Sequence, residues 1–87
     1  MKSYSFELSN EHGLHARPAG LLIQTCSKFN SQISLIKNGQ KFNCKSMLGV
    51  LKMAGTKGDA LTIEIDGADE AEALNALKAL IAANFNE

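Results

Sequence analysis

The 87-residue sequence has few of the features that mark a nucleic-acid-binding or membrane-binding protein. It has no tryptophan and five aromatic residues in all, one Tyr and four Phe, with no arrangement that would stack bases. Nine basic and nine acidic residues give a formal net charge of zero. No bulk attraction to nucleic acid or to an acidic membrane is therefore expected, and a ferredoxin-like RNA-binding domain is disfavoured.

Long apolar runs and paired cysteines are also lacking. No run approaches the roughly 20 residues that a helix needs to span a bilayer, and the start, Met1 to Tyr4, leads into no signal-peptide core. We therefore expect a cytoplasmic protein with no membrane insertion. The two cysteines, Cys26 and Cys44, form no C-x-x-C pair and stand among apolar residues, which predicts buried, reduced thiols.

What the sequence does have is enough apolar residues, 45%, for one modest core. The length suits one domain over residues 1–87 and is too short for two. Period-2 alternation predicts strands around residues 4–8, 33–35, 42–44 and 61–65. Helical spacing predicts a helix that starts near Pro18, a short one after residue 46 and a long one after residue 69.

Local signals mark the ends of these elements. Asn38-Gly39 predicts a type I′ hairpin, and Ser46 is a plausible N-cap of the short helix, which Gly55 could end. Asp69 and Glu72 have capping-box spacing at the start of the last helix. The order β-α-β-β-α-β-α, with one apolar face per strand, predicts a two-layer α/β sandwich. Its sheet would be antiparallel or mixed, with helices covering one side.

The segment from Gly13 to Ala19, G-L-H-A-R-P-A, carries the chemistry. With Pro18 in the first turn, His15 lies at the N-terminal end of a helix, where unpaired N–H groups and partial positive charge favour an anion. An imidazole there can serve as a nucleophile, and Arg17 adds a guanidinium suited to phosphate oxygens. We interpret His15 as a residue that accepts and passes on a phosphoryl group.

Physical reasoning alone leaves two other roles for His15 open. The histidine could simply sit in a loop and cap the helix. It could also bind a metal together with His12, although Glu11 is the only further ligand type nearby and zinc usually takes three or four protein ligands. We expect no metal.

Two motifs resemble those of a known family. Gly13 to Ala19 resembles the active-site motif of HPr, the histidine-containing phosphocarrier family of the bacterial sugar phosphotransferase system. Lys45 to Leu51, K-S-M-L-G-V-L, resembles that family's second motif, and the likeness extends over nearly the whole chain. The resemblance implies an open-faced β-sandwich in which three helices cover one face of a four-stranded, mainly antiparallel sheet.

The same resemblance implies a carrier rather than an enzyme, without a cofactor. His15 would take a phosphoryl group from phosphorylated enzyme I and pass it to a histidine on the IIA component of a sugar permease. Arg17 would stabilise the phosphoryl group, and the chain would act as a monomer. At position 12 the family usually has a small polar residue, so His12 is a departure that could contact the phosphoryl group or influence His15.

Further residues acquire roles by resemblance. Ser46 would be a regulatory phosphorylation site for an HPr kinase/phosphorylase, and its modified form would recruit a catabolite-control transcription factor. A surface for protein partners would comprise Met47, Leu48 and Leu51, extended by Gly20 and Gln24. Two alternatives remain: an interaction protein that acts through phosphorylated Ser46 alone, and a carrier in a nitrogen-regulatory phosphorelay.

Overall fold

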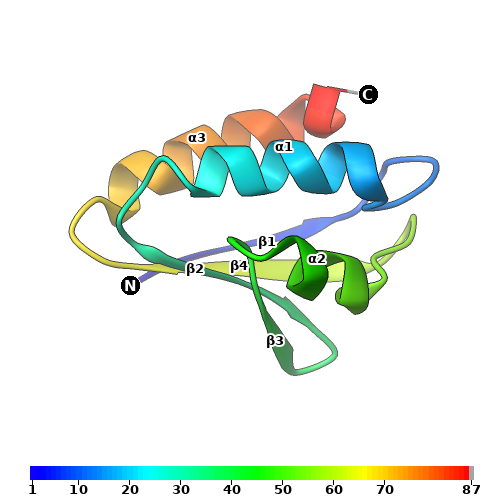
Figure 1. The fold of residues 1–87 in the computed structure, drawn as a ribbon, viewed down its shortest axis with the longest axis horizontal. Coiled ribbons are helices and arrows are strands. Elements are labelled where there is room, and N and C mark those ends of the chain that lie inside the picture. The colour runs from blue at the N-terminus through cyan, green and yellow to red at the C-terminus, as the bar shows by residue number, and fades with distance from the viewer. Residues whose placement is uncertain (87) are drawn as a thin grey trace.

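A computed structural model describes residues 1–86. Within them, four strands and three α-helices follow one another in the predicted β-α-β-β-α-β-α order, and a short 3-10 helix comes after them (Figure 1). The elements are β1 (Lys2–Glu7), α1 (Ala16–Cys26), β2 (Gln32–Lys37), β3 (Gln40–Asn43), α2 (Met47–Met53), β4 (Ala60–Asp66), α3 (Glu70–Ala82) and η1 (Asn84–Asn86).

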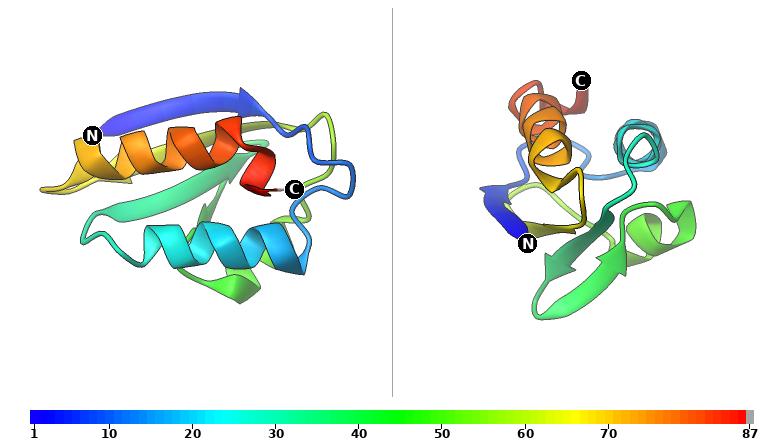
Figure 2. Two further views of the ribbon diagram at one scale, coloured as in Figure 1. Left: turned by 90° about the horizontal axis from the view of Figure 1, so that it is seen from above. Right: turned by 90° about the vertical axis from the view of Figure 1, so that its left-hand side faces the viewer.

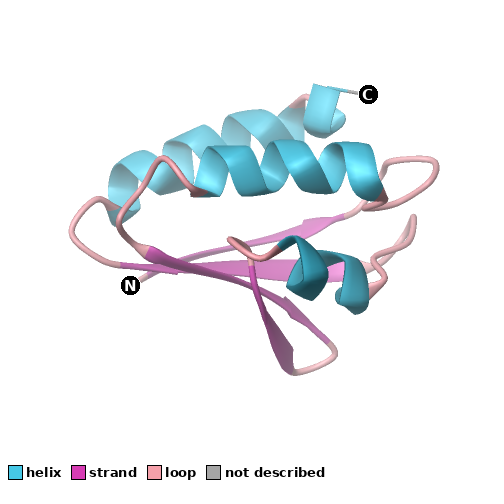
Figure 3. Ribbon diagram, in the orientation of Figure 1, coloured by secondary structure: helices cyan, strands magenta, loops and turns pink. Residues whose placement is uncertain are grey.

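The four strands form one antiparallel sheet in the order β1-β4-β2-β3. Ile63 of β4 lies opposite both Tyr4 of β1 and Leu35 of β2. Because side chains alternate along a strand, this register gathers the buried apolar residues on one face. The strands form one layer and α1 and α3 a second layer over it (Figure 3). The predicted two-layer fold with one open face is therefore confirmed.

The core lies between the sheet and the helices, and it fixes the position of α1. Ala19, Leu22 and Cys26 of α1 are at most 1% exposed and form one cluster with buried residues of the sheet and of α2 and α3. Full burial of a leucine or isoleucine side chain contributes about 1.5–3 kcal/mol. With its apolar face held in this way, α1 presents its N-terminal end at a fixed place.

Both cysteines are buried free thiols, as predicted. Cys26 on α1 and Cys44 after β3 lie side by side, and their hydrogen bond, together with burial, raises the pKa of the Cys44 thiol. A thiol whose pKa is raised is not a nucleophile near neutral pH. The pair therefore belongs to the core.

Two local predictions hold in the structure. Asn38 and Gly39 both have positive φ, +53° and +80°, as a type I′ hairpin between β2 and β3 requires. Ser46 is the N-cap of α2, and its Oγ accepts a hydrogen bond of 3.1 Å from the Gly49 N–H.

The prediction that Gly55 ends the short helix is wrong. Ala54 takes the left-handed C-cap conformation, with φ +55°, and donates its N–H to the Leu51 carbonyl. Gly55 is used for close packing instead: it is buried, and a Cβ there would lie 3.2 Å from Leu8 Cδ2. Met53 Cε would be 3.1 Å away, so a side chain at this position would require its neighbours to shift, and the neighbouring alanine adopts the unusual backbone angle.

The capping box at Asp69 and Glu72 is also wrong. The Asp69 side chain does not cap α3; its carboxylate accepts hydrogen bonds from the Ser31 hydroxyl and from the N–H groups of Asn30 (2.8 Å) and Ser31 (2.9 Å). Ser31 is fully buried and needs such a partner. Asp69 therefore joins the start of α3 to the loop between α1 and β2.

These bonds predict a loss of stability in acid that depends on Asp69. The Ser31 hydroxyl and the Asn30 N–H lower the pKa of the Asp69 carboxyl. A carboxylate with a lowered folded-state pKa stabilises the fold above its unfolded-state pKa, about 3.9, and this contribution disappears as the pH falls through the folded-state value. In urea unfolding, Asp69→Asn should therefore be less stable than wild type at pH 7, and the gap should narrow as the pH falls below the unfolded-state pKa of about 3.9. An equal gap at pH 7 and at the lower pH would contradict this.

Candidate functional site

His15 occupies the place that the sequence predicts, at the N-terminal end of α1. It is the N-cap residue, with an extended backbone (φ −79°, ψ −173°), and its side chain is half-buried. The His15 carbonyl accepts the first helical hydrogen bond, 3.0 Å from the Ala19 N–H. The N–H groups of Ala16 and Arg17 have no acceptor within a helix that starts here, whereas Pro18 has no N–H group. An anion bound beside His15 would meet these donors and the positive end of the helix dipole.

The loop from β1 to α1 is fixed to a second loop, which runs from α2 to β4. The Leu14 N–H donates to the Gly55 carbonyl over 3.0 Å, and the Leu14 side chain is buried. Gly13 has φ +68°, and its N–H donates to the Asn10 carbonyl over 3.1 Å. These hydrogen bonds therefore fix the backbone conformation of the loop that leads to His15.

Two further polar side chains lie near this helix end. Arg17 is exposed on the second residue of α1, and His12 is exposed in the loop. The rings of His12 and His15 meet edge to face, with centroids 6.0 Å apart and planes at 71°. Among residues 1–86, no group of three or more His, Cys, Asp or Glu side chains is placed to hold a metal ion. Two imidazole rings therefore meet at a helix N-terminus, and the second residue of that helix is an exposed arginine.

The residues expected to form a partner surface lie on α2 and the neighbouring face of α1. Met47, Leu48 and Leu51 are 41%, 75% and 40% exposed; we call these three the apolar patch. A Cβ at Gly20 would lie 3.7 Å from Met47 Cε, an ordinary van der Waals distance, so Gly20 of α1 lies next to the Met47 side chain of α2. Gln24, one turn further along α1, is exposed.

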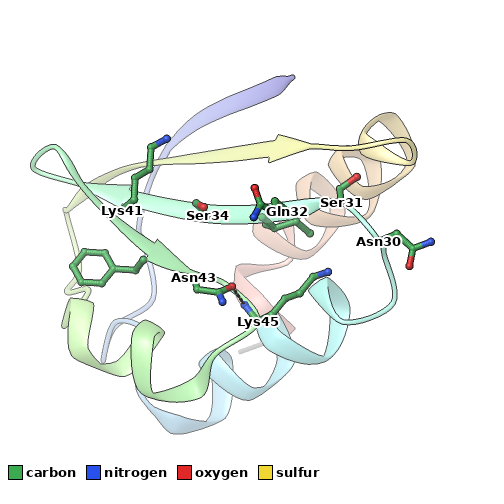
Figure 4. A pocket seen from close by; sticks show the side chains of 9 residues that line it. Asn30, Ser31, Gln32, Ser34, Lys41, Asn43 and Lys45 are labelled. Carbon is green, nitrogen blue, oxygen red and sulfur yellow. Dashed lines mark hydrogen bonds between the residues drawn. The ribbon is translucent and has the colours of Figure 1, made fainter.

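A polar cavity of about 400 Å³ lies away from this site, near the C-terminal end of α1 (Figure 4). It opens between β2, β3 and the loop before β2, and Lys41 and Lys45 are among its lining residues. Both ammonium groups already have partners: Lys41 pairs with Glu64 (3.1 Å) and Lys45 donates to the Phe29 carbonyl (2.7 Å). None of the predicted site residues lines it.

Residues 2–83 match a family model described as the phosphorylation site of the PTS HPr component. The chain belongs to the HPr family. It is 44% identical to the phosphocarrier protein HPr of Neisseria meningitidis over 87 residues, which cover 100% of this chain and 98% of that protein. Members of the HPr family are phosphocarriers of the phosphotransferase system, not enzymes, and this chain is one of them.

Solved structures of HPr proteins share the fold. The crystal structure of HPr from Thermoanaerobacter tengcongensis superposes with a TM-score of 0.95 at 44% identity, covering 100% of this chain and 98% of that chain. Crh of Bacillus subtilis, a relative that its description links to catabolite repression, is 37% identical with a TM-score of 0.76 and 97% of each chain covered. None of the helices in residues 1–86 has the length and apolar character to cross a membrane.

Sequence reasoning missed two residues beside this HPr site. Asn10 is 3% exposed although it lies in a polar loop, and Phe85 is 2% exposed although it follows the end of α3. Phe85 continues the apolar spacing of α3, four residues after Ile81, so a signal for it existed. The burial of Asn10 has no counterpart in the local sequence, since its partner lies 74 residues away.

Proposed function

We propose that His15 is the residue that carries the phosphoryl group. It accepts the group from phosphorylated enzyme I and passes it to a histidine of a IIA component. The observation that carries this proposal is the position of His15 as the N-cap of α1, beside the helix N–H groups and the positive end of the helix dipole and two residues before Arg17.

The chemistry follows from this position. An unprotonated ring nitrogen of His15 forms a bond to phosphorus while the bond between phosphorus and the donor atom of enzyme I breaks, and the donor atom keeps that electron pair. The N–H groups of Ala16 and Arg17 and the Arg17 guanidinium stabilise charge on the phosphoryl oxygens without a metal ion. Transfer to the IIA histidine is the same exchange with His15 as the leaving group.

A carrier must also bind two different proteins in turn. The apolar patch suits this, because exposed side chains of this size within one helix are common in protein interfaces. Gly20 and Gln24 extend it along α1. Partners that cover this surface would bring their reacting group towards the N-terminal end of α1.

The test is incubation of the protein with enzyme I and labelled phosphoenolpyruvate. We expect an acid-labile, base-stable phosphoryl adduct that maps to His15 and moves on when a sugar-permease IIA component is added. A nitrogen-regulatory carrier would give the same adduct but transfer it to a different class of IIA protein. An adduct on another residue, or none, contradicts the proposal.

A second, regulatory role is proposed for Ser46. Its hydroxyl is half-buried at the N-cap of α2, directly before the apolar patch. A phosphate there adds nearly two negative charges, which the α2 N-terminus tolerates but which an apolar partner surface disfavours. The modified form would instead serve a different partner, a catabolite-control transcription factor.

With ATP and an HPr kinase/phosphorylase, the protein should acquire an acid-stable adduct that is absent from Ser46→Ala. The substitution also removes the cap to Gly49, at a cost of about 1 kcal/mol in the free energy of unfolding, so the variant remains folded. Ser5→Ala, on β1, is the matched control and should be labelled normally. Acid-stable label in Ser46→Ala would refute the regulatory assignment.

A further inference from the structure

The C-terminal segment after α3 turns back onto the loop that precedes His15. Asn84 and Phe85 both have left-handed backbone angles, with φ +51° and +55°, and they reverse the chain direction. Phe85 is thereby buried to 98% in the core, where η1 contacts both α1 and α3. The view from above in Figure 2 shows this segment, in red, beside the loop that leads into α1.

Two hydrogen bonds join this segment to the loop before His15. Asn10 Nδ2 donates to the Asn84 carbonyl over 2.7 Å, and Ser9 Oγ donates to Asn84 Oδ1 over 2.6 Å. The Asn10 carbonyl in turn accepts the Gly13 N–H over 3.1 Å. A short hydrogen-bonded path therefore runs from the core at Phe85, through Asn84 and Asn10, to the residues directly before His15.

Asn10 is costly for the fold. Its Oδ1 is buried and has no hydrogen-bond partner among the residues that the structure describes. A buried acceptor without a partner destabilises the folded state, which offsets part of what the bond to Asn84 contributes. Stability alone therefore explains the asparagine poorly. Its side chain instead ties the start of the loop to Asn84, while its backbone carbonyl, which any residue would supply, accepts the Gly13 N–H.

We propose that Asn10, held by Asn84, is a positioning residue for phosphoryl transfer at His15. This rests on the proposed role of His15. A nucleophile on a loop reacts efficiently only if the loop is held in the reacting geometry, and a displacement of about 1 Å can lower the rate by up to 10²-fold. Gly55 fixes the end of the loop nearest the helix, and Asn10 fixes its start.

The test compares Asn10→Ala with wild type and with Ser5→Ala. The Ser5 control removes a hydrogen bond to Thr62 between β1 and β4, outside this loop. For Asn10→Ala we expect a maximal rate of phosphorylation by enzyme I about tenfold lower, with the KM for the carrier unchanged because the apolar patch is intact. Its thermal midpoint should shift by no more than a few degrees, since a bond and an unpaired acceptor disappear together. NMR signals of the His15 ring should broaden or shift in Asn10→Ala and stay fixed in Ser5→Ala.

The outcomes separate this proposal from the one on which it rests. If enzyme I labels no His15 in the wild-type protein, the proposed function fails, whereas the ring signals still report whether Asn10 positions the imidazole. If the wild type is labelled and Asn10→Ala has the same maximal rate and the same His15 signals, the positioning role is refuted. Should Asn10→Ala not fold, Ser9→Ala provides the test, because Ser9 is exposed and its substitution removes one of the two hydrogen bonds to Asn84. Its maximal rate of phosphorylation should be reduced two- to threefold, with an unchanged KM. A wild-type rate in Ser9→Ala would also refute the positioning role.

Discussion

Replacing His15 by alanine should give a folded protein that accepts no phosphoryl group from enzyme I. The phosphorus–nitrogen bond cannot form without the imidazole, so the loss should be on the order of 10³-fold or more, down to the detection limit. The fold should persist, because the backbone carbonyl of residue 15, which accepts the Ala19 N–H, is retained. Incorporation of label from phosphoenolpyruvate, alongside a circular dichroism spectrum, measures both parts.

His12→Ala is the matched control for this loss. His12 is an exposed imidazole in the same loop, with its ring centroid 6.0 Å from that of His15, so it tests whether any nearby histidine would serve. We expect His12→Ala to be labelled at His15. Label that persists in His15→Ala, or that appears on His12 in that variant, would assign the carrier role elsewhere.

Most of the fold could be predicted because the patterns that specify it are local. Alternation in the strand that contains Leu61, Ile63 and Ile65 is what a sheet with one covered face requires, and these three are buried. Asn38-Gly39 and Ser46 also act over two to four residues. Such short-range signals can be recognised in the sequence before any tertiary structure is known.

The predictions that failed concern residues whose partners are distant in sequence. Asp69 has the spacing of a capping box, but the buried Ser31, 38 residues earlier, competes for its carboxylate. Gly55 looks like a helix terminator, but it is packed closely against the side chains of Met53 and Leu8, where a Cβ would make tight contacts. In both cases the residue type correctly indicated that the position has a structural role. Contacts with residues distant in sequence determined which role it has.

The candidate site shows the same division. His15 and Arg17 lie within three residues of each other at a helix start that Pro18 marks, so the sequence is sufficient to bring them together. For α2, the resemblance implied a partner surface of Met47, Leu48 and Leu51, and in the structure each of these three side chains is at least 40% exposed. Asn10, which ties the loop to the C-terminal segment, had no local signal, since the bond to Asn84 exists only in the folded chain.

Gly13→Ala should be the most damaging single-methyl substitution near the site. An alanine at φ +68° costs about 1–2 kcal/mol, and its Cβ would lie 2.1 Å from the Gly55 carbonyl oxygen and 2.9 Å from Thr56 Cα. Because both neighbours are backbone, relief requires the two loops to separate, which breaks the bond from Leu14 to Gly55. We expect a total loss of about 3 kcal/mol in the free energy of unfolding and a thermal midpoint lowered by roughly 10–20 °C.

Gly39→Ala is the control that separates the cost of a positive φ from the cost of the steric clash at residue 13. Gly39 also has positive φ, +80°, but a Cβ there meets no atom within 4 Å. It should therefore lose only about 1 kcal/mol and accept phosphoryl groups at the wild-type rate, since the β2–β3 hairpin holds none of the site residues. Gly13→Ala, measured below its lowered midpoint, should still be slow to accept label because residue 15 moves with the loop. Equal effects of the two substitutions on stability and on transfer would show that the contact with Gly55 does not hold the histidine in place.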